Sequence, residues 1–151
     1  MATTNAEVVQ TQTDGCYLGN PGICGAGGII RNEKSDIIIA FVEDLGEGTN
    51  NGAELLALLY GKRHAKRMGI NQLEEGLDSL IVVNWLRSKV CGIWYLEDYW
   101  EETKYLLSII SCRVQHIYRE SNSVADVLSK LEASSVSHIV LDSIAISSSV
   151  R

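Results

Sequence analysis

The spacing of the apolar residues changes near Ala53, and this change restricts the fold more than any other feature. Before it, β-branched segments such as Ala26–Arg31 and Ile37–Val42 are separated by a short polar turn, which predicts a β-hairpin. From Ala53 to Met68, apolar residues recur at helical spacing. A chain that starts with strands and continues with alternating helices and strands predicts an α/β fold, in which helices pack on a mixed sheet.

The expected order is three strands, a helix, a strand, two helices, a strand and a last helix. The expected strands are Val8–Thr13, Ala26–Arg31, Ile37–Val42, Gln72–Leu77 and Cys112–Tyr118. The expected helices are Ala53–Met68, a short helix capped by Ser79, Tyr95–Ile110, and one that runs from Asn122 or Ser123 to about Leu131. Residues 1–132 are thus expected to form one domain, and the Ser-rich residues 133–151 a loose tail.

Composition indicates a globular chain with one core. The 151 residues are 46% hydrophobic and 21% charged, which excludes a disordered polar chain. No secretory signal is visible at the start, and the apolar run His138–Ile146 is too short to span a bilayer. The cysteines are far apart, which favours reduced thiols in an intracellular protein. We expect a monomer in the nucleus or cytoplasm, neither secreted nor bound to a membrane.

Four acidic residues stand where an expected strand ends or an expected helix begins: Asp14, Glu54, Asp78 and Asp126. Elements of one small sheet can bring such residues together at one edge. Clustered carboxylates repel one another unless protons or cations are present, and oxygen ligands favour a hard cation such as Mg²⁺. Each acid taken alone could equally be a helix cap or a solvated carboxylate. Together they predict a metal site.

The segments around these acids resemble the type 1 ribonuclease H domain, and in particular the plant ribonuclease H-like domains related to retroelement reverse transcriptases. The resemblance runs from about Thr13 to Lys130. It is carried by TDGCYLGNPG, TNNGAELLAL, LDSLIVVNWL and HIYRESNSVADVLSK. It implies a five-stranded mixed sheet, with the first three strands antiparallel, flanked by about four helices.

The same resemblance implies cleavage of the RNA strand of an RNA–DNA hybrid by two Mg²⁺ ions, which Mn²⁺ can replace. Asp14 would bridge both ions, Glu54 and Asp78 would complete one coordination shell, and Asp126 the other. Two cations roughly 3.5–4 Å apart can activate the attacking water and stabilise the leaving 3′-oxygen.

Further residues match substrate contacts of the family. Those expected to contact the hybrid are Gly15, Cys16, Asn20, Thr49, Asn50, Asn51 and Ser79. The alternative for Thr49–Asn51 is an ordinary loop and helix cap. Arg119 is expected to take the catalytic role that a flexible histidine has in many relatives. His116 falls within an expected strand, so a structural role is expected for it.

Glu75 is the main departure from the family pattern. Residues Leu73–Asp78 read Leu-Glu-Glu-Gly-Leu-Asp, where Leu-Glu-Val-Glu-Gly-Asp is usual, so strand alternation turns Glu75 inward. A buried unpaired carboxylate costs several kcal/mol. Either the strand shifts its register or Glu75 has a partner, and either is expected to move Asp78 and impair activity.

The net charge of −6 counts against binding to phosphates. A basic group on one expected helix weakens this objection, although it could also be a solvated helix face: Lys62, Arg63, His64, Lys66 and Arg67. Two alternatives therefore stay open besides the hybrid ribonuclease. One is a catalytically silent domain that binds nucleic acid or protein. The other is a metal exonuclease, against which the GNPG and TNN segments argue.

Overall fold

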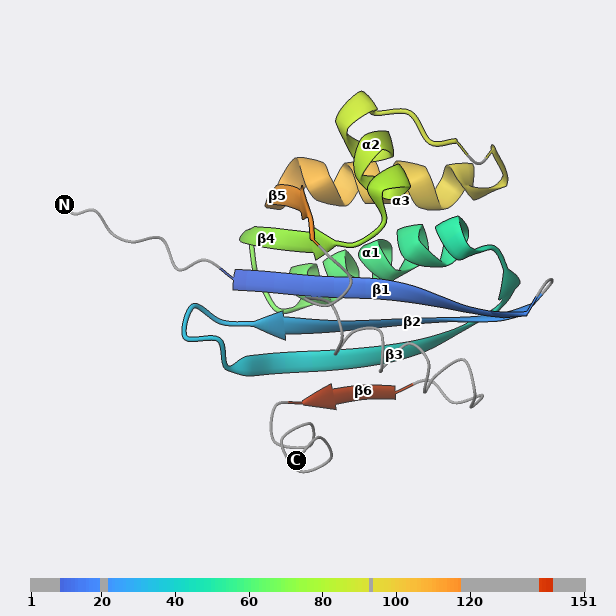
Figure 1. The fold of residues 1–151 in the computed structure, drawn as a ribbon. Coiled ribbons are helices and arrows are strands. Elements are labelled where there is room, and N and C mark those ends of the chain that lie inside the picture. Colours follow the sequence, from blue (N-terminus) through green and yellow to red (C-terminus); the bar gives the residue numbers. More distant parts are fainter. Residues whose placement is uncertain (1–8, 20–21, 93, 118–138, 143–151) are drawn as a thin grey trace.

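The strands form one mixed sheet. The computed structural model describes residues 9–19, 22–92, 94–117 and 139–142 (Figure 1). Within them the strands lie in the order β5-β4-β1-β2-β3-β6. Strand β1 pairs antiparallel with β2 and parallel with β4. The strand bounds are Val9–Gly19 (β1), Gly22–Arg31 (β2), Ile37–Gly48 (β3), Gln72–Leu77 (β4), Ser111–His116 (β5) and Ile139–Asp142 (β6).

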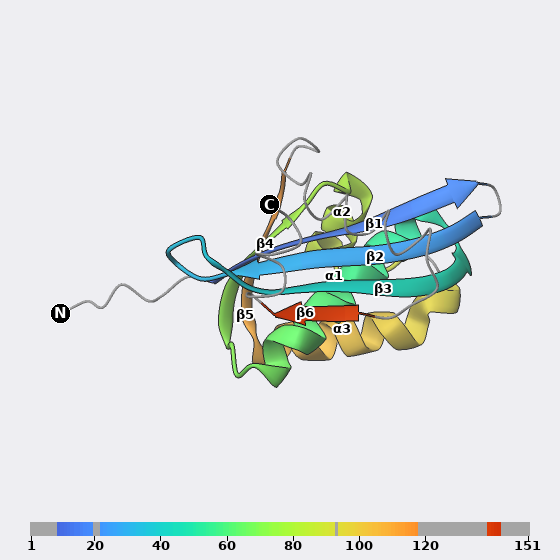
Figure 2. The same ribbon diagram turned by 90° about the horizontal axis from the view of Figure 1, so that it is seen from below.

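The described helices pack together beside the sheet (Figures 1 and 2). They are α1 (Asn50–Arg67), α2 (Leu80–Ser88) and α3 (Glu97–Ile109), the last preceded by the 3₁₀ turn η1 (Trp94–Leu96). One apolar cluster joins Leu58 of α1 to Leu77 of β4, Val82 of α2 and Trp100 of α3. The expected α/β fold with a mixed sheet is thus confirmed. The expected helix from Asn122 or Ser123 lies outside the described residues.

Several elements are longer than expected. Strand β1 continues to Gly19, so Asp14 lies inside the strand, opposite Gly27 of β2, and not at the strand's end. Strand β3 continues to Gly48 through a register shift at which Gly46 has a φ of 69°. The turn residues that suggested a loop there form a bulged strand, because glycine tolerates this backbone conformation.

Strand β6 corrects the expectation of a loose tail. Ile139–Asp142 pairs antiparallel with β3, between Ile39↔Asp142 and Val42↔Ile139 (Figure 2). The apolar, β-branched character of this segment suits an edge strand, which outweighs the serine bias around it. Among the described residues, the sheet therefore has six strands, where five were expected. Among the described residues, no helix is both long and apolar enough to cross a membrane.

Glu75 keeps its strand in register and has a partner. Strand β4 pairs continuously with β1, from Val9↔Leu73 to Gln12↔Gly76, so the expected alternative of a register shift is wrong. The Glu75 side chain faces α1, where it forms an ion pair with Lys62 Nζ. Both side chains are 0% exposed. Thr11 Oγ1 donates to Glu75 Oε1 at 2.5 Å, and Thr13 Oγ1 donates to Oε2 at 2.9 Å.

A buried ion pair makes each partner dependent on the other. We expect Lys62→Met to lower the free energy of unfolding by about 3–5 kcal/mol, because the substitution leaves the Glu75 carboxylate buried without a counter-charge. The double variant Lys62→Leu/Glu75→Val should recover most of that loss. Urea denaturation of the three proteins tests this. A loss below about 1 kcal/mol in Lys62→Met would contradict the burial of the pair.

Candidate active site

Three of the four predicted acids converge. Asp14 from β1, Glu54 from α1 and Asp78, directly after β4, each offer a carboxylate oxygen, and these oxygens lie within 4.8 Å of one another. Asp14 and Glu54 are buried, and Asp78 is half-buried. Asp78 is therefore not displaced by Glu75, contrary to expectation. The fourth acid, Asp126, lies outside the described residues.

The approach of α1 to β1 brings Glu54 to Asp14. At Gly15, an added Cβ atom would lie 2.3 Å from the backbone carbon of Ala53 and 2.6 Å from the Glu54 nitrogen. Only glycine lets the first turn of α1 come this close to the strand. The Gly15 N–H donates to Glu54 Oε1 at 3.2 Å. Gly15, expected to contact substrate, thus also has a structural role in placing Glu54.

Burial and repulsion favour the protonated form of Glu54. Loss of hydration raises the pKa of its carboxyl group well above the ordinary value of 4.5. A hydrogen bond with Asp14 and the charges of Asp14 and Asp78 raise it further, whereas the Gly15 N–H lowers it. A divalent cation would remove this repulsion. The donor set consists of carboxylate oxygens, which suits a hard ion such as Mg²⁺.

Asp78 is oriented by the elements on either side. Ser79 caps α2, as expected from the sequence, and its hydroxyl accepts a hydrogen bond from Val82 N at 3.3 Å. On the other side, His116 Nε2 lies 3.2 Å from the Asp78 carbonyl oxygen. His116 ends β5, where it pairs with Leu77. A structural role in a strand was expected for His116, and its nearness to Asp78 follows only from the parallel pairing of β4 and β5.

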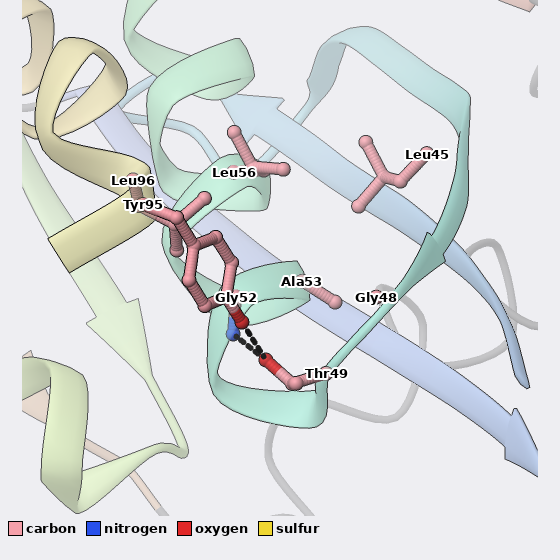
Figure 3. Close-up of a pocket in the computed structure, with 8 residues that line it drawn as sticks. All are labelled: Leu45, Gly48, Thr49, Gly52, Ala53, Leu56, Tyr95 and Leu96. Carbon is pink, nitrogen blue, oxygen red and sulfur yellow. Dashed lines mark hydrogen bonds between the residues drawn. The ribbon is translucent and has the colours of Figure 1, made fainter. Parts of the chain in front are cut away.

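Thr49 is the N-cap of α1 and lies at the edge of a small pocket (Figure 3). Its hydroxyl accepts from Gly52 N at 3.1 Å, which confirms the cap that the sequence offered as an alternative. The hydroxyl also lies 3.4 Å from Tyr95 Oη, which points toward it from η1. Asn50 and Asn51 are the first two residues of α1. Tyr95 was expected only as the first residue of a helix, and its contact with Thr49 joins segments 46 residues apart.

Other expected contacts are only partly described. Asn20 and Arg119 lie outside the described residues. Cys16 lies in β1, where it pairs with Gly25, and its backbone alone is described. Cys112, which lies in β5, is a free thiol.

The basic residues of α1 do not form one exposed face. Lys62 and His64 are buried, so the expectation of a common basic side is wrong for both. Arg63 Nε and a terminal nitrogen each lie 2.6 Å from a Glu102 oxygen, which raises the pKa of the guanidinium. Lys66 and Arg67 are exposed. This helix therefore presents much less uncompensated positive charge than its sequence suggests.

Residues 12–132 match the profile of the reverse transcriptase-like family. The chain belongs to this family of ribonuclease H-like domains. It is also 30% identical, over 121 residues, to an Arabidopsis thaliana protein provisionally named a ribonuclease H protein. The alignment covers 80% of this chain but only 20% of that protein, so this ribonuclease H-like chain spans about a fifth of its relative.

Solved ribonucleases H share the fold. The ribonuclease H1 of the archaeon Halobacterium salinarum is 27% identical, with a TM-score of 0.77, and the match covers 85% of this chain and 98% of that one. LC11-RNase H1, solved in complex with an RNA/DNA hybrid, is 26% identical with a TM-score of 0.75. That match covers 83% of this chain and 96% of that one. The LC11 enzyme was isolated from compost by a metagenomic approach.

The raised pKa of Glu54 predicts a pH dependence of the metal-free protein. The folded chain holds this proton more tightly than the unfolded chain, so Glu54 favours folding below pH 4.5. That contribution is lost as the pH rises through the raised pKa of the folded state. We expect Glu54→Gln to lack this loss and to gain stability relative to the wild type as the pH rises. Thermal unfolding in EDTA at several pH values tests this, and a constant difference between the two proteins would contradict it.

The contact at Gly15 predicts a steric effect. Gly15→Ala should lower the free energy of unfolding by about 1–3 kcal/mol, because the new methyl group meets backbone atoms that cannot rotate away. Gly46→Asn is the control, since nothing lies within 4 Å of a Cβ there and asparagine tolerates positive φ. Urea denaturation compares the two. Equal stability of Gly15→Ala and the wild type would contradict the close approach.

Proposed function

We propose that this domain hydrolyses the RNA strand of RNA–DNA hybrids with the help of two divalent cations, Mg²⁺ or Mn²⁺. The observation that carries the proposal is the convergence of Asp14, Glu54 and Asp78 within 4.8 Å in a domain of the ribonuclease H-like class. A similar structure, LC11-RNase H1, was solved with an RNA/DNA hybrid bound. The hybrid is accordingly the substrate that we propose here.

The carboxylates would hold the cations in fixed positions. Asp14, Glu54 and Asp78 would hold the ions, and Asp126 is proposed by resemblance as a further ligand. When bound, the two cations supply activation of the attacking water and stabilisation of the leaving 3′-oxygen. Products with a 5′-phosphate and a 3′-hydroxyl follow from that displacement.

The residues around α1 would orient the substrate. Thr49, Asn50 and Asn51 lie at the start of α1, where N–H groups point outward and favour a phosphate. Asn20 and Cys16 belong to the proposed contacts by resemblance, and Arg119 is the proposed aid to proton transfer or product release. The 2′-hydroxyls in the wide minor groove would distinguish RNA from DNA.

The alternative of a catalytically silent domain loses one of its three supports, which were Glu75, the net charge of −6 and the small basic surface. Glu75 has a buried counter-charge and does not displace Asp78. The exposed surface of α1 carries little positive charge, so we expect its binding of nucleic acid to be weak and salt-dependent. An exonuclease of the same general fold would require a free end, which a cleavage experiment reveals directly.

Cleavage of an end-blocked, internally labelled RNA–DNA hybrid tests the proposal. We expect internal cuts in the RNA strand with Mg²⁺ or Mn²⁺, none in EDTA, and none in double-stranded DNA. Asp14→Asn should reduce the rate by at least about 100-fold, because loss of a ligand should exceed the 10- to 100-fold effect of outer contacts. Lys104→Gln, an exposed substitution on α3, is the control.

The absence of any cut with both metals, in protein that unfolds cooperatively, would falsify the proposed activity. Binding of the hybrid without cleavage would instead favour the silent domain. Cleavage only of hybrids with unblocked ends would favour the exonuclease.

A further inference from the structure

The buried polar network in the core connects the same three elements that carry the site acids. Lys62 and Glu54 both belong to α1. Glu75 belongs to β4, and this strand ends directly before Asp78. Thr11 and Thr13 belong to β1, as does Asp14. The network is thus placed to control how α1, β1 and β4 lie relative to one another.

Its geometry fixes those relations more sharply than apolar contacts could. The Glu75 carboxylate accepts from Thr11 at 2.5 Å through one oxygen and from Thr13 at 2.9 Å through the other, and it pairs with Lys62. Thr11 Oγ1 also lies 3.3 Å from the Glu74 carbonyl oxygen of β4. A hydrogen bond requires its donor and acceptor to keep a narrow range of distance and angle, and a low-dielectric core raises the cost of losing it.

The network lies close to the acids along each element. Thr13 precedes Asp14 by one residue, and Glu75 precedes Asp78 by three. Lys62 follows Glu54 by eight residues on a continuous helix, about 12 Å along its axis. Metal sites require ligand positions within about 0.5 Å, so a small shift of α1 along β1 would be felt at the cluster.

We propose that Lys62, Glu75, Thr11 and Thr13 act as positioning residues that hold the three carboxylates in the geometry that binds divalent cations. None of them needs to touch the metal or the substrate. The inference rests on the metal site of the proposed function, and it adds that the core polar network sets the affinity of that site. Apolar side chains would suffice to fill the core at the positions of Lys62 and Glu75.

The test separates metal affinity from stability. Lys62→Leu/Glu75→Val replaces the ion pair by apolar side chains, and it should unfold cooperatively with a Tm near that of the wild type. We expect its affinity for Mn²⁺, measured by calorimetry on the metal-free protein, to fall by about 10- to 100-fold. Hybrid cleavage should require a correspondingly higher Mn²⁺ concentration, with an unchanged KM for the hybrid at saturating metal.

Two further variants keep the result interpretable. Arg63→Met/Glu102→Gln removes an ion pair between α1 and α3 without touching β1 or β4, and its Mn²⁺ affinity should equal that of the wild type. Thr13→Val removes one hydroxyl donor and keeps the ion pair. It should weaken Mn²⁺ binding by a smaller factor, and it carries the test if the apolar double variant does not fold.

The outcomes distinguish this inference from the proposed activity. Wild-type Mn²⁺ affinity in the apolar double variant and in Thr13→Val overturns the positioning role. An equal loss of affinity in Arg63→Met/Glu102→Gln also overturns it, because the effect would then be general. Wild-type protein that binds Mn²⁺ but cleaves no hybrid overturns the proposed activity alone. Wild-type protein that binds no Mn²⁺ overturns both.

Discussion

The contact between α1 and β1 is the constraint on which the site depends. Backbone atoms of the first helical turn lie where any side chain at position 15 would be, so the helix is seated directly on the central strand. This seating brings Glu54 to Asp14 and aligns α1 over β1 and β2. The parallel pairing of β4 with β1 then adds Asp78 to the cluster. The three acids are distant in sequence, and they meet because α1 packs against β1 and because β4 pairs with β1.

The sequence predicted the order and type of these elements because their signals are local. The hairpin turn after Arg31, the cap at Ser79 and the glycine after α1 each act within a few residues of the boundary that they set. The family motifs added the identity of the acids. The far end of β3 was missed because its glycine is typical of a loop, and strand β6 because it pairs with β3, about 100 residues earlier in the chain.

A partner for the inward-facing Glu75 was one of two expected outcomes, but Lys62 was not identified as that partner. Lys62 was interpreted only as one member of a basic group on its helix. Yet Lys62 follows Leu58 by four residues and Leu59 by three, which places it on the apolar stripe of α1. An inward lysine on the helix and an inward glutamate on the strand that it covers are the signal of a pair. Recognising it requires the two elements to be considered together.

The same pair bears on how this chain can change over time. A lysine at position 62 without Glu75, or the reverse, leaves one uncompensated charge in the core, which is among the most harmful single changes a small domain can undergo. Neither position can therefore be exchanged alone for an apolar residue without a poorly folded intermediate. Positions 62 and 75 should be inherited, and engineered, as one unit. A chain with this pair can reach two apolar residues at positions 62 and 75 only through such an intermediate or by two simultaneous substitutions.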